Sequence, residues 1–121
     1  MADQTRLNEQ PVGDVERREG AVVVHLVGEL DLYNAAELRR ALLELCAEQP
    51  ERLVVDLAEV DFVDSTALGV LIEARTKLAN RRSFLLAAPG LETYRALLIS
   101  GLDQHLSVHE SVEDALESPI A

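Results

Sequence analysis

The residue types best suited to chemistry lie together in the segment Asp64-Ser65-Thr66, between an apolar strand-like stretch and an apolar helix-like stretch. Hydroxyl groups at the start of a helix lie where backbone N–H groups have no partner within the helix and where the helix dipole is positive. Such a position can cap the helix, hold a phosphate, or do both. Asp64, Ser65 or Thr66 can each serve as the cap. A phosphate on Ser65 would instead add about −1.5 to −2 charges beside Asp61 and Asp64, and so change how this surface meets a partner.

A second candidate site is the segment Gly28-Glu29-Leu30-Asp31, which ends another strand-like stretch. In open α/β sheets, loops at the carboxyl ends of parallel strands gather at one edge. We therefore expect Asp31 to lie near Ser65. The alternative is a turn glycine followed by solvated acids that have no functional role.

Catalytic and metal-binding patterns are weak in this chain. Ser65 is not part of a G-x-S-x-G nucleophile elbow, and there is no glycine-rich phosphate loop. His25 lies in the middle of an apolar run, which indicates a structural residue or one on a sheet face. His105 and His109 have the spacing of a helical metal pair, but Val108 and the neighbouring turn residues argue against a helix there. We therefore expect no enzyme, no metal site and no cofactor; a hydrolase that uses Ser65 is the alternative.

Cys46 is the only cysteine, so neither an internal disulfide nor a thiolate metal cluster can form. It falls on the apolar stripe of an expected helix, which favours a buried structural thiol. The alternative is a redox-active thiol.

Length, composition and charge limit the class of protein. At 121 residues, 48% of them apolar, the chain can bury a core without disulfides or metals. Its formal net charge of −11 argues against nucleic acid and anionic membrane as partners and favours a basic protein surface. The N-terminus lacks the regions of a signal peptide, and no apolar run approaches the ~20 residues of a membrane span, so we expect a cytoplasmic protein.

Strand-like and helix-like segments alternate from residue 21 onward. Strands are expected at residues 14–18, 21–27, 53–57, 83–87 and 106–109. Helices are expected at residues 34–48, 65–80 and 91–100, and in a short segment opened by a capping-box pattern at 111–114. The first two strands can pair as an antiparallel hairpin, and the later alternation implies right-handed parallel crossovers. We therefore predict an α/β fold with a small mixed, mostly parallel sheet of four to five strands and about four helices.

Several segments, in order along the chain, resemble those of the STAS domain family, in particular the bacterial anti-sigma factor antagonists. They are similar to the family's G-E-L-D segment (28–31), central strand (53–57), D-S-[ST]-G-L-G motif (64–69) and G-L-D turn (101–103). The resemblance covers roughly residues 12–117 and implies the STAS fold, with a flexible lead-in at 1–12 and a single STAS domain at 13–118. Ala67 stands where the family usually has glycine. Its methyl group favours the helix, but we expect it to hinder close approach of a kinase.

The resemblance also implies a regulatory function. Unphosphorylated family members bind an anti-sigma factor that is also a serine kinase, and so release the sigma factor. The kinase then phosphorylates the first hydroxyl of the motif, here Ser65, after which the complex separates and a phosphoserine phosphatase resets the switch. The implied partner-binding residues are Asp31, Asp64, Thr66 and Leu68. An alternative within the family is a stand-alone scaffold or regulatory subunit of a stress-signalling assembly or a transporter ATPase.

Overall fold

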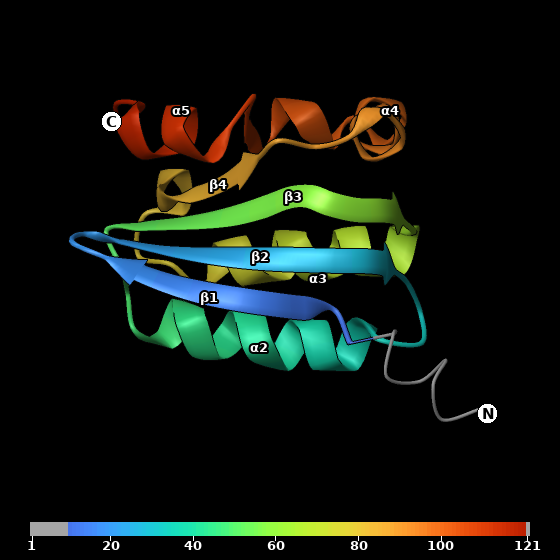
Figure 1. Cartoon of the computed structure of the whole chain (residues 1–121), viewed down its shortest axis with the longest axis horizontal. Helices are drawn as coiled ribbons and strands as arrows, with labels where there is room; N and C mark the ends of the chain where they lie inside the picture. The colour runs from blue at the N-terminus through green and yellow to red at the C-terminus, as the bar shows by residue number, and fades with distance from the viewer. Residues whose placement is uncertain (1–9, 121) are drawn as a thin grey trace.

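The computed structural model describes residues 10–120, and Figure 1 shows their arrangement in layers. Five strands form one sheet in the order β1-β2-β3-β4-β5. β1 pairs with β2 in antiparallel orientation, and each later strand is parallel to the one before it. The strands are β1 Val12–Arg18, β2 Ala21–Leu30, β3 Arg52–Val63, β4 Phe84–Ala87 and β5 Ser107–His109. The prediction of a small mixed, mostly parallel sheet is confirmed.

Helices connect the parallel strands and cover the sheet. They are α2 Ala35–Ala47, α3 Ser65–Thr76, α4 Leu91–Ser100 and α5 Val112–Glu117, with 3-10 turns at η1 Arg81–Ser83 and η2 Leu102–Gln104. α2 and α3 lie on one face of the sheet, α5 covers part of the other face, and α4 packs beside β3 (Figure 1). In residues 10–120 no helix combines the length and apolar character needed to cross a bilayer.

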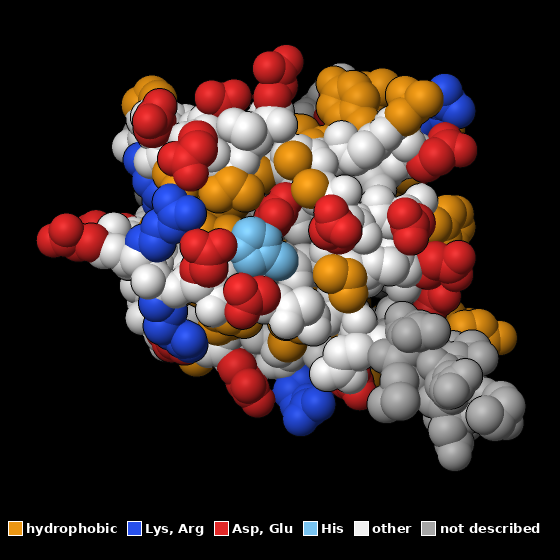
Figure 2. Space-filling model, viewed as in Figure 1, with side chains coloured by type: hydrophobic (Ala, Val, Ile, Leu, Met, Phe, Trp, Pro, Cys, Tyr) orange, Lys and Arg blue, Asp and Glu red, His pale blue; other side chains and the backbone are white. Residues whose placement is uncertain are grey.

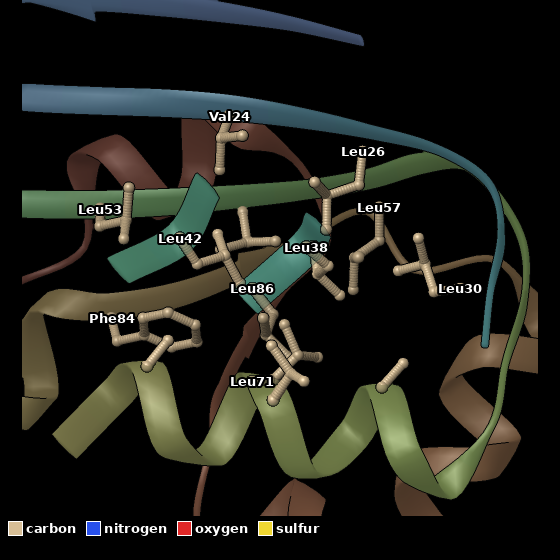
Figure 3. Close-up of a cluster of buried hydrophobic side chains, with 14 of the residues drawn as sticks. Val24, Leu26, Leu30, Leu38, Leu42, Leu53, Leu57, Leu71, Phe84 and Leu86 are labelled. Atoms are coloured by element: carbon tan, nitrogen blue, oxygen red, sulfur yellow. The ribbon is translucent and has the colours of Figure 1, made fainter. Parts of the chain in front are cut away.

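The larger core lies between the sheet and helices α2 and α3. Successive residues of β2 alternate between the faces, so that Val24 joins this core while Val23 packs on the α5 side. Figure 3 shows strand side chains gathered with Leu38 and Leu42 of α2 and Leu71 of α3. Each fully buried leucine contributes about 1.5 to 3 kcal/mol, so the packed sheet is a firm support for the loops at its edges.

The strands β2 and β3 are both longer than expected. β2 continues to Leu30 instead of ending before Gly28, and β3 continues to Val63 instead of ending at Leu57. The second half of β3 is half-buried: Val60 and Val63 face the core, but their neighbours are exposed. The first half, in contrast, is nearly all apolar and buried. Leu30 and Val63 are paired in the parallel register, so both strands end at the same edge.

Two further boundaries differ from expectation. α3 ends at Thr76 rather than near Asn80, whose side-chain oxygen instead accepts the N–H of Arg82 to start η1. At the other end of the chain, residues 1–9 of the expected flexible lead-in lie outside the described residues. The sheet begins within the last part of that segment, at Val12, and the carbonyl of Pro11 accepts the N–H of Val27 at 2.9 Å.

Candidate functional site

Ser65 is the first residue of α3, at the edge where β2 and β3 end, and its side chain is exposed. The cap of this helix is Asp64, whose Oδ1 atom accepts the backbone N–H of Ala67 at 2.9 Å. Within residues 10–120 the Ser65 hydroxyl has no hydrogen-bond partner. The structure thus decides among the three possible caps and leaves the hydroxyl of Ser65 accessible from solvent.

Asp64 also joins two loops. Its Oδ2 atom accepts the backbone N–H of Leu32 at 3.0 Å, and its own N–H donates to the carbonyl of Leu30 at 3.0 Å. The loop after β2, which carries Asp31, therefore lies against the start of α3. This is the proximity expected from the carboxyl ends of neighbouring parallel strands.

The loop of residues 31–34 is held by its own polar side chains. The carboxylate of Asp31 accepts the N–H of Tyr33 at 3.0 Å. Asn34 accepts the N–H of Asp31 at 3.0 Å and donates to the carbonyl of Glu29 at 2.8 Å, and only 6% of the residue is exposed. Asn34 was not among the sequence candidates, although an asparagine three residues after an aspartate is a turn signal. Asp31 therefore has a structural role in the loop, whatever else it contacts.

The motif residues of α3 divide into a buried and an exposed set. Thr66 and Gly69 are exposed, whereas Ala67 is 0% and Leu68 7% exposed. Because the methyl group of Ala67 lies in the core, it cannot obstruct a partner, and the expectation that it hinders a kinase is wrong. Leu68 packs in the same core, so among the four expected partner-binding residues it offers a partner the least surface.

Exposed apolar side chains accompany these polar groups. Leu32 is 65% exposed, Tyr33 82% and Phe62 49%. The first two lie in the loop after β2, and Phe62 lies near the end of β3, two residues before Asp64. Exposed apolar groups bordered by polar ones mark protein–protein contact sites, and tyrosine is enriched in such contacts. The sequence signal that identifies them is a Leu-Tyr pair inside a polar turn and a phenylalanine between aspartates.

The surroundings of Ser65 are acidic. The segments 28–34 and 58–69 contain no lysine, arginine or histidine. Their carboxylates are Glu29, Asp31, Glu59, Asp61 and Asp64. A surface with this charge and a few exposed apolar side chains is complementary to a basic surface with an apolar centre.

A separate polar cluster surrounds His25 on the sheet face away from α2 and α3. Its Nδ1 atom is 2.6 Å from Oδ2 of Asp56, and its Nε2 atom is 2.6 Å from Oε2 of Glu16. Figure 2 shows carboxylates around the histidine on this face. Burial by itself lowers the pKa of His25, but the hydrogen bonds to Glu16 and Asp56 outweigh it and raise the pKa above the ordinary 6.5. His25 is thus a sheet-face residue, as predicted, and both ring nitrogens already face carboxylates.

The remaining candidates for metal or thiol chemistry are not assembled into sites. His109 ends β5 and His105 precedes that strand, so they do not form a helical pair. Over residues 10–120 there is no cluster of His, Cys, Asp or Glu side chains able to hold a metal ion. Cys46 is buried, and its thiol donates to the carbonyl of Ala74 at 3.3 Å. Burial raises the pKa of this thiol to about 11.

Comparison with known proteins agrees with this geometry. The pattern of the STAS domain family matches residues 14–115. The anti-sigma-F factor antagonist RsfB of Mycobacterium tuberculosis is 35% identical over 97 residues, which cover 80% of this chain and 80% of that protein. A solved anti-sigma factor antagonist from Mycobacterium paratuberculosis is 34% identical with a TM-score of 0.80, covering 85% of this chain and 88% of the other. The Bacillus protein SpoIIAA in its phosphorylated form shares the fold at 20% identity, with a TM-score of 0.63 and coverage of 86% and 96%. The match extends over most of the sheet and all of its crossovers, and the chain belongs to the STAS domain family.

Proposed function

We propose that this protein is an anti-sigma factor antagonist, whose unphosphorylated form binds an anti-sigma factor and so releases a sigma factor. The observation that carries this proposal is the exposed Ser65 hydroxyl, left free by the Asp64 cap at the start of α3. It is supported by the 35% identity to a protein named anti-sigma-F factor antagonist. The chain acts as a binding partner and a substrate, not as a catalyst.

The proposed binding surface combines three features. Ser65 and Thr66 provide exposed hydroxyls, Leu32, Tyr33 and Phe62 provide apolar contact area, and the neighbouring carboxylates provide negative charge. Such a surface suits a partner with basic side chains around an apolar patch, since charge complementarity guides association while buried apolar groups supply affinity.

Phosphorylation of Ser65 by the anti-sigma factor, acting as a serine kinase, would end this binding. A phosphate at the start of a helix lies near unpaired backbone N–H groups, so the fold can tolerate it. In the complex with the partner, however, the phosphate is unfavourable. It carries about −1.5 to −2 charges beside Asp61 and Asp64, which adds like-charge repulsion, and it must lose its hydration when the complex forms. A phosphoserine phosphatase would restore the binding form.

Affinity measurements with a candidate anti-sigma kinase test the switch. We expect Ser65→Ala to bind with the affinity of the wild type. The affinity of Ser65→Asp and Ser65→Glu should be lower by ~10-fold or more, because each places a negative charge in the interface with the partner. The control is Ala47→Glu, which adds one charge at the exposed end of α2, on the opposite edge of the sheet. Equal affinities for all four variants would remove Ser65 from the mechanism.

Phosphate mapping tests the chemistry independently. Incubation with the kinase and ATP should add one phosphate, located at Ser65 by mass spectrometry and absent in Ser65→Ala. The adjacent Thr66 is also exposed, so Thr66→Ala is the matched control and should still be phosphorylated. A phosphate found only on Thr66 would move the site by one residue.

A further inference from the structure

A second hollow lies at the edge of the sheet opposite to Ser65, where β4 and β5 begin. Its volume is about 400 Å³. The walls come from the end of α3, the turns η1 and η2, and the residues that follow α5. The side chains in its wall that can donate hydrogen bonds include Arg75, Arg81, Arg82, Gln104, His105 and His109.

This hollow is basic although the protein is strongly acidic. The chain has 22 Asp and Glu residues against 11 Lys and Arg residues, yet no Asp or Glu side chain of residues 10–120 lines this hollow. Other hollows differ in this respect. Glu110 lines one beside α4, and Glu19, Glu51 and Glu113 line another beside the turn between β1 and β2.

The arginines of the hollow also lack the carboxylate partners that several other arginines of this protein have. Arg17, Arg18, Arg39 and Arg95 form ion pairs with nearby carboxylates, whereas Arg40 and Arg52 form none with residues 10–120. Arg75, Arg81 and Arg82 form no ion pair with any residue in 10–120. Three like charges that line one hollow repel one another, and an anion that contacts them offsets this repulsion.

We propose that this hollow binds a small phosphate-bearing molecule. The planar guanidinium group contacts two phosphate oxygens at once, and a phosphomonoester brings about −1.5 to −2 charges to be shared among three arginines, whereas a carboxylate brings one. A volume of about 400 Å³ is that of a small-molecule site rather than of a peptide groove. Pro119 and Ile120 provide apolar contacts for the organic part of the ligand.

The lining of the hollow also includes a hydrogen-bonded polar pair. The hydroxyl of Ser107 and Nε2 of His109 are 3.0 Å apart and hydrogen-bonded, so either group is positioned by the other. Both residues belong to β5 and line the hollow. The site is therefore built on a strand and a helix end, and it does not involve Ser65 or depend on the proposed regulatory function.

Titration of the full chain by ¹H–¹⁵N NMR tests the proposal. The probes are glycerol phosphate, inorganic phosphate and acetate, added at constant ionic strength so that general screening stays fixed. We expect saturable shifts around Arg81, Arg82 and Ser107, with glycerol phosphate tighter than inorganic phosphate and acetate weakest. Shifts that do not saturate would overturn the site. Equal affinity of acetate would overturn the phosphate class, and equal affinity of the two phosphates would overturn a contact with the organic part of the ligand.

Variants separate a specific site from diffuse attraction. Replacing Arg75, Arg81 and Arg82 together by Gln should weaken glycerol phosphate binding by ~10-fold or more, because charge-assisted hydrogen bonds are lost. Arg40→Gln is the matched control, since Arg40 is an exposed arginine of α2 outside the hollow. If Arg40→Gln and the triple variant bind alike, the proposal fails. If the triple variant does not fold, the single variants Arg81→Gln and Arg82→Gln, both at exposed positions, test whether these arginines bind glycerol phosphate. Ser65→Asp should bind glycerol phosphate as the wild type does.

Discussion

The Oδ2 atom of Asp64 accepts the backbone N–H of Leu32 at 3.0 Å and so connects two loops that are far apart in the sequence. The other oxygen of the same carboxylate caps α3 through the N–H of Ala67. One side chain thus holds both the helix start that carries Ser65 and the loop that carries Tyr33. The shape of the proposed binding surface depends on this carboxylate.

Removing the Asp64 carboxylate should therefore destabilise the fold. We expect Asp64→Ala to lower the free energy of unfolding by about 1 to 2 kcal/mol, the usual cost of a lost helix cap. Asp64→Asn keeps a capping oxygen and should cost less. Urea denaturation followed by circular dichroism measures both changes.

Asp61→Ala is the matched control for Asp64→Ala. Asp61 is exposed in the same segment, and its carboxylate has no hydrogen bond or ion pair within residues 10–120. Its removal should change the free energy of unfolding by less than ~0.5 kcal/mol. Equal losses for the Asp61 and Asp64 variants would mean that general charge, rather than the two hydrogen bonds, is responsible.

Gly69→Ala should raise the stability of the fold and weaken binding of the partner. Gly69 is exposed in the middle of α3, and a Cβ atom placed there meets nothing within 4 Å. Alanine in a helix interior is more favourable than glycine by roughly 0.5 to 1 kcal/mol, so the variant should be more stable. Because Gly69 lies one turn after Ser65 on the same side of the helix, the added methyl group should also weaken binding of the anti-sigma factor.

The comparison variant for Gly69→Ala is Thr76→Ala, at the exposed far end of α3. It should leave the affinity for the partner unchanged. Titration calorimetry with the partner, together with thermal unfolding, gives both quantities. A Gly69→Ala variant that binds as tightly as the wild type would exclude this helix face from the interface.

The α-helices could be predicted from apolar spacing to within a few residues. α2 matches the expected segment almost residue for residue, because a buried stripe repeating every three to four residues is a strong local signal. α4 also has the expected bounds, although only Thr93 and Leu97 of this helix are buried. The second half of β3 could not be predicted, since residues 58–63 are exposed on one side and contain two acids. The extension of β3 depends on pairing with β2, which is a long-range property.

The candidate site could be predicted in part. The motif around Ser65 identifies this residue as a candidate. Which of Asp64, Ser65 and Thr66 caps the helix depends on backbone geometry that the sequence does not specify. The burial of Ala67 was contained in the sequence, because its spacing to Val70, Leu71 and Ala74 places it in the apolar stripe. Tyr33 was missed because exposure of a loop aromatic depends on packing.

Cys46 should be unreactive while the protein is folded. Its thiol is buried, and burial raises its pKa to about 11, so little thiolate forms at neutral pH. Labelling with a thiol reagent at about pH 8 should be slow in buffer and fast in denaturing urea, since unfolding restores an ordinary thiol. Equally fast labelling in both conditions would show that the α2 region opens readily.

The pH dependence of stability should report the contacts of His25. The hydrogen bonds to Glu16 and Asp56 favour the charged imidazolium and raise its pKa in the folded state above 6.5. This contribution to stability is fully present below the unfolded pKa of 6.5 and is lost as the pH rises through the higher folded pKa. The difference in free energy of unfolding between wild type and His25→Gln should therefore decrease as the pH rises from below 6.5 through the higher folded pKa.

The titration of His25, followed by NMR of its ring protons, identifies which carboxylates cause this effect. Glu16→Gln removes one of the two carboxylates that contact the ring and should lower the titration midpoint of His25. Asp14→Asn removes an equal charge from the same strand, where Asp14 pairs with His25 in the backbone register but makes no hydrogen bond to its ring. The midpoint should move much less in this variant. If both variants shift it equally, the raised pKa reflects the general negative field of the protein and not the two 2.6 Å contacts.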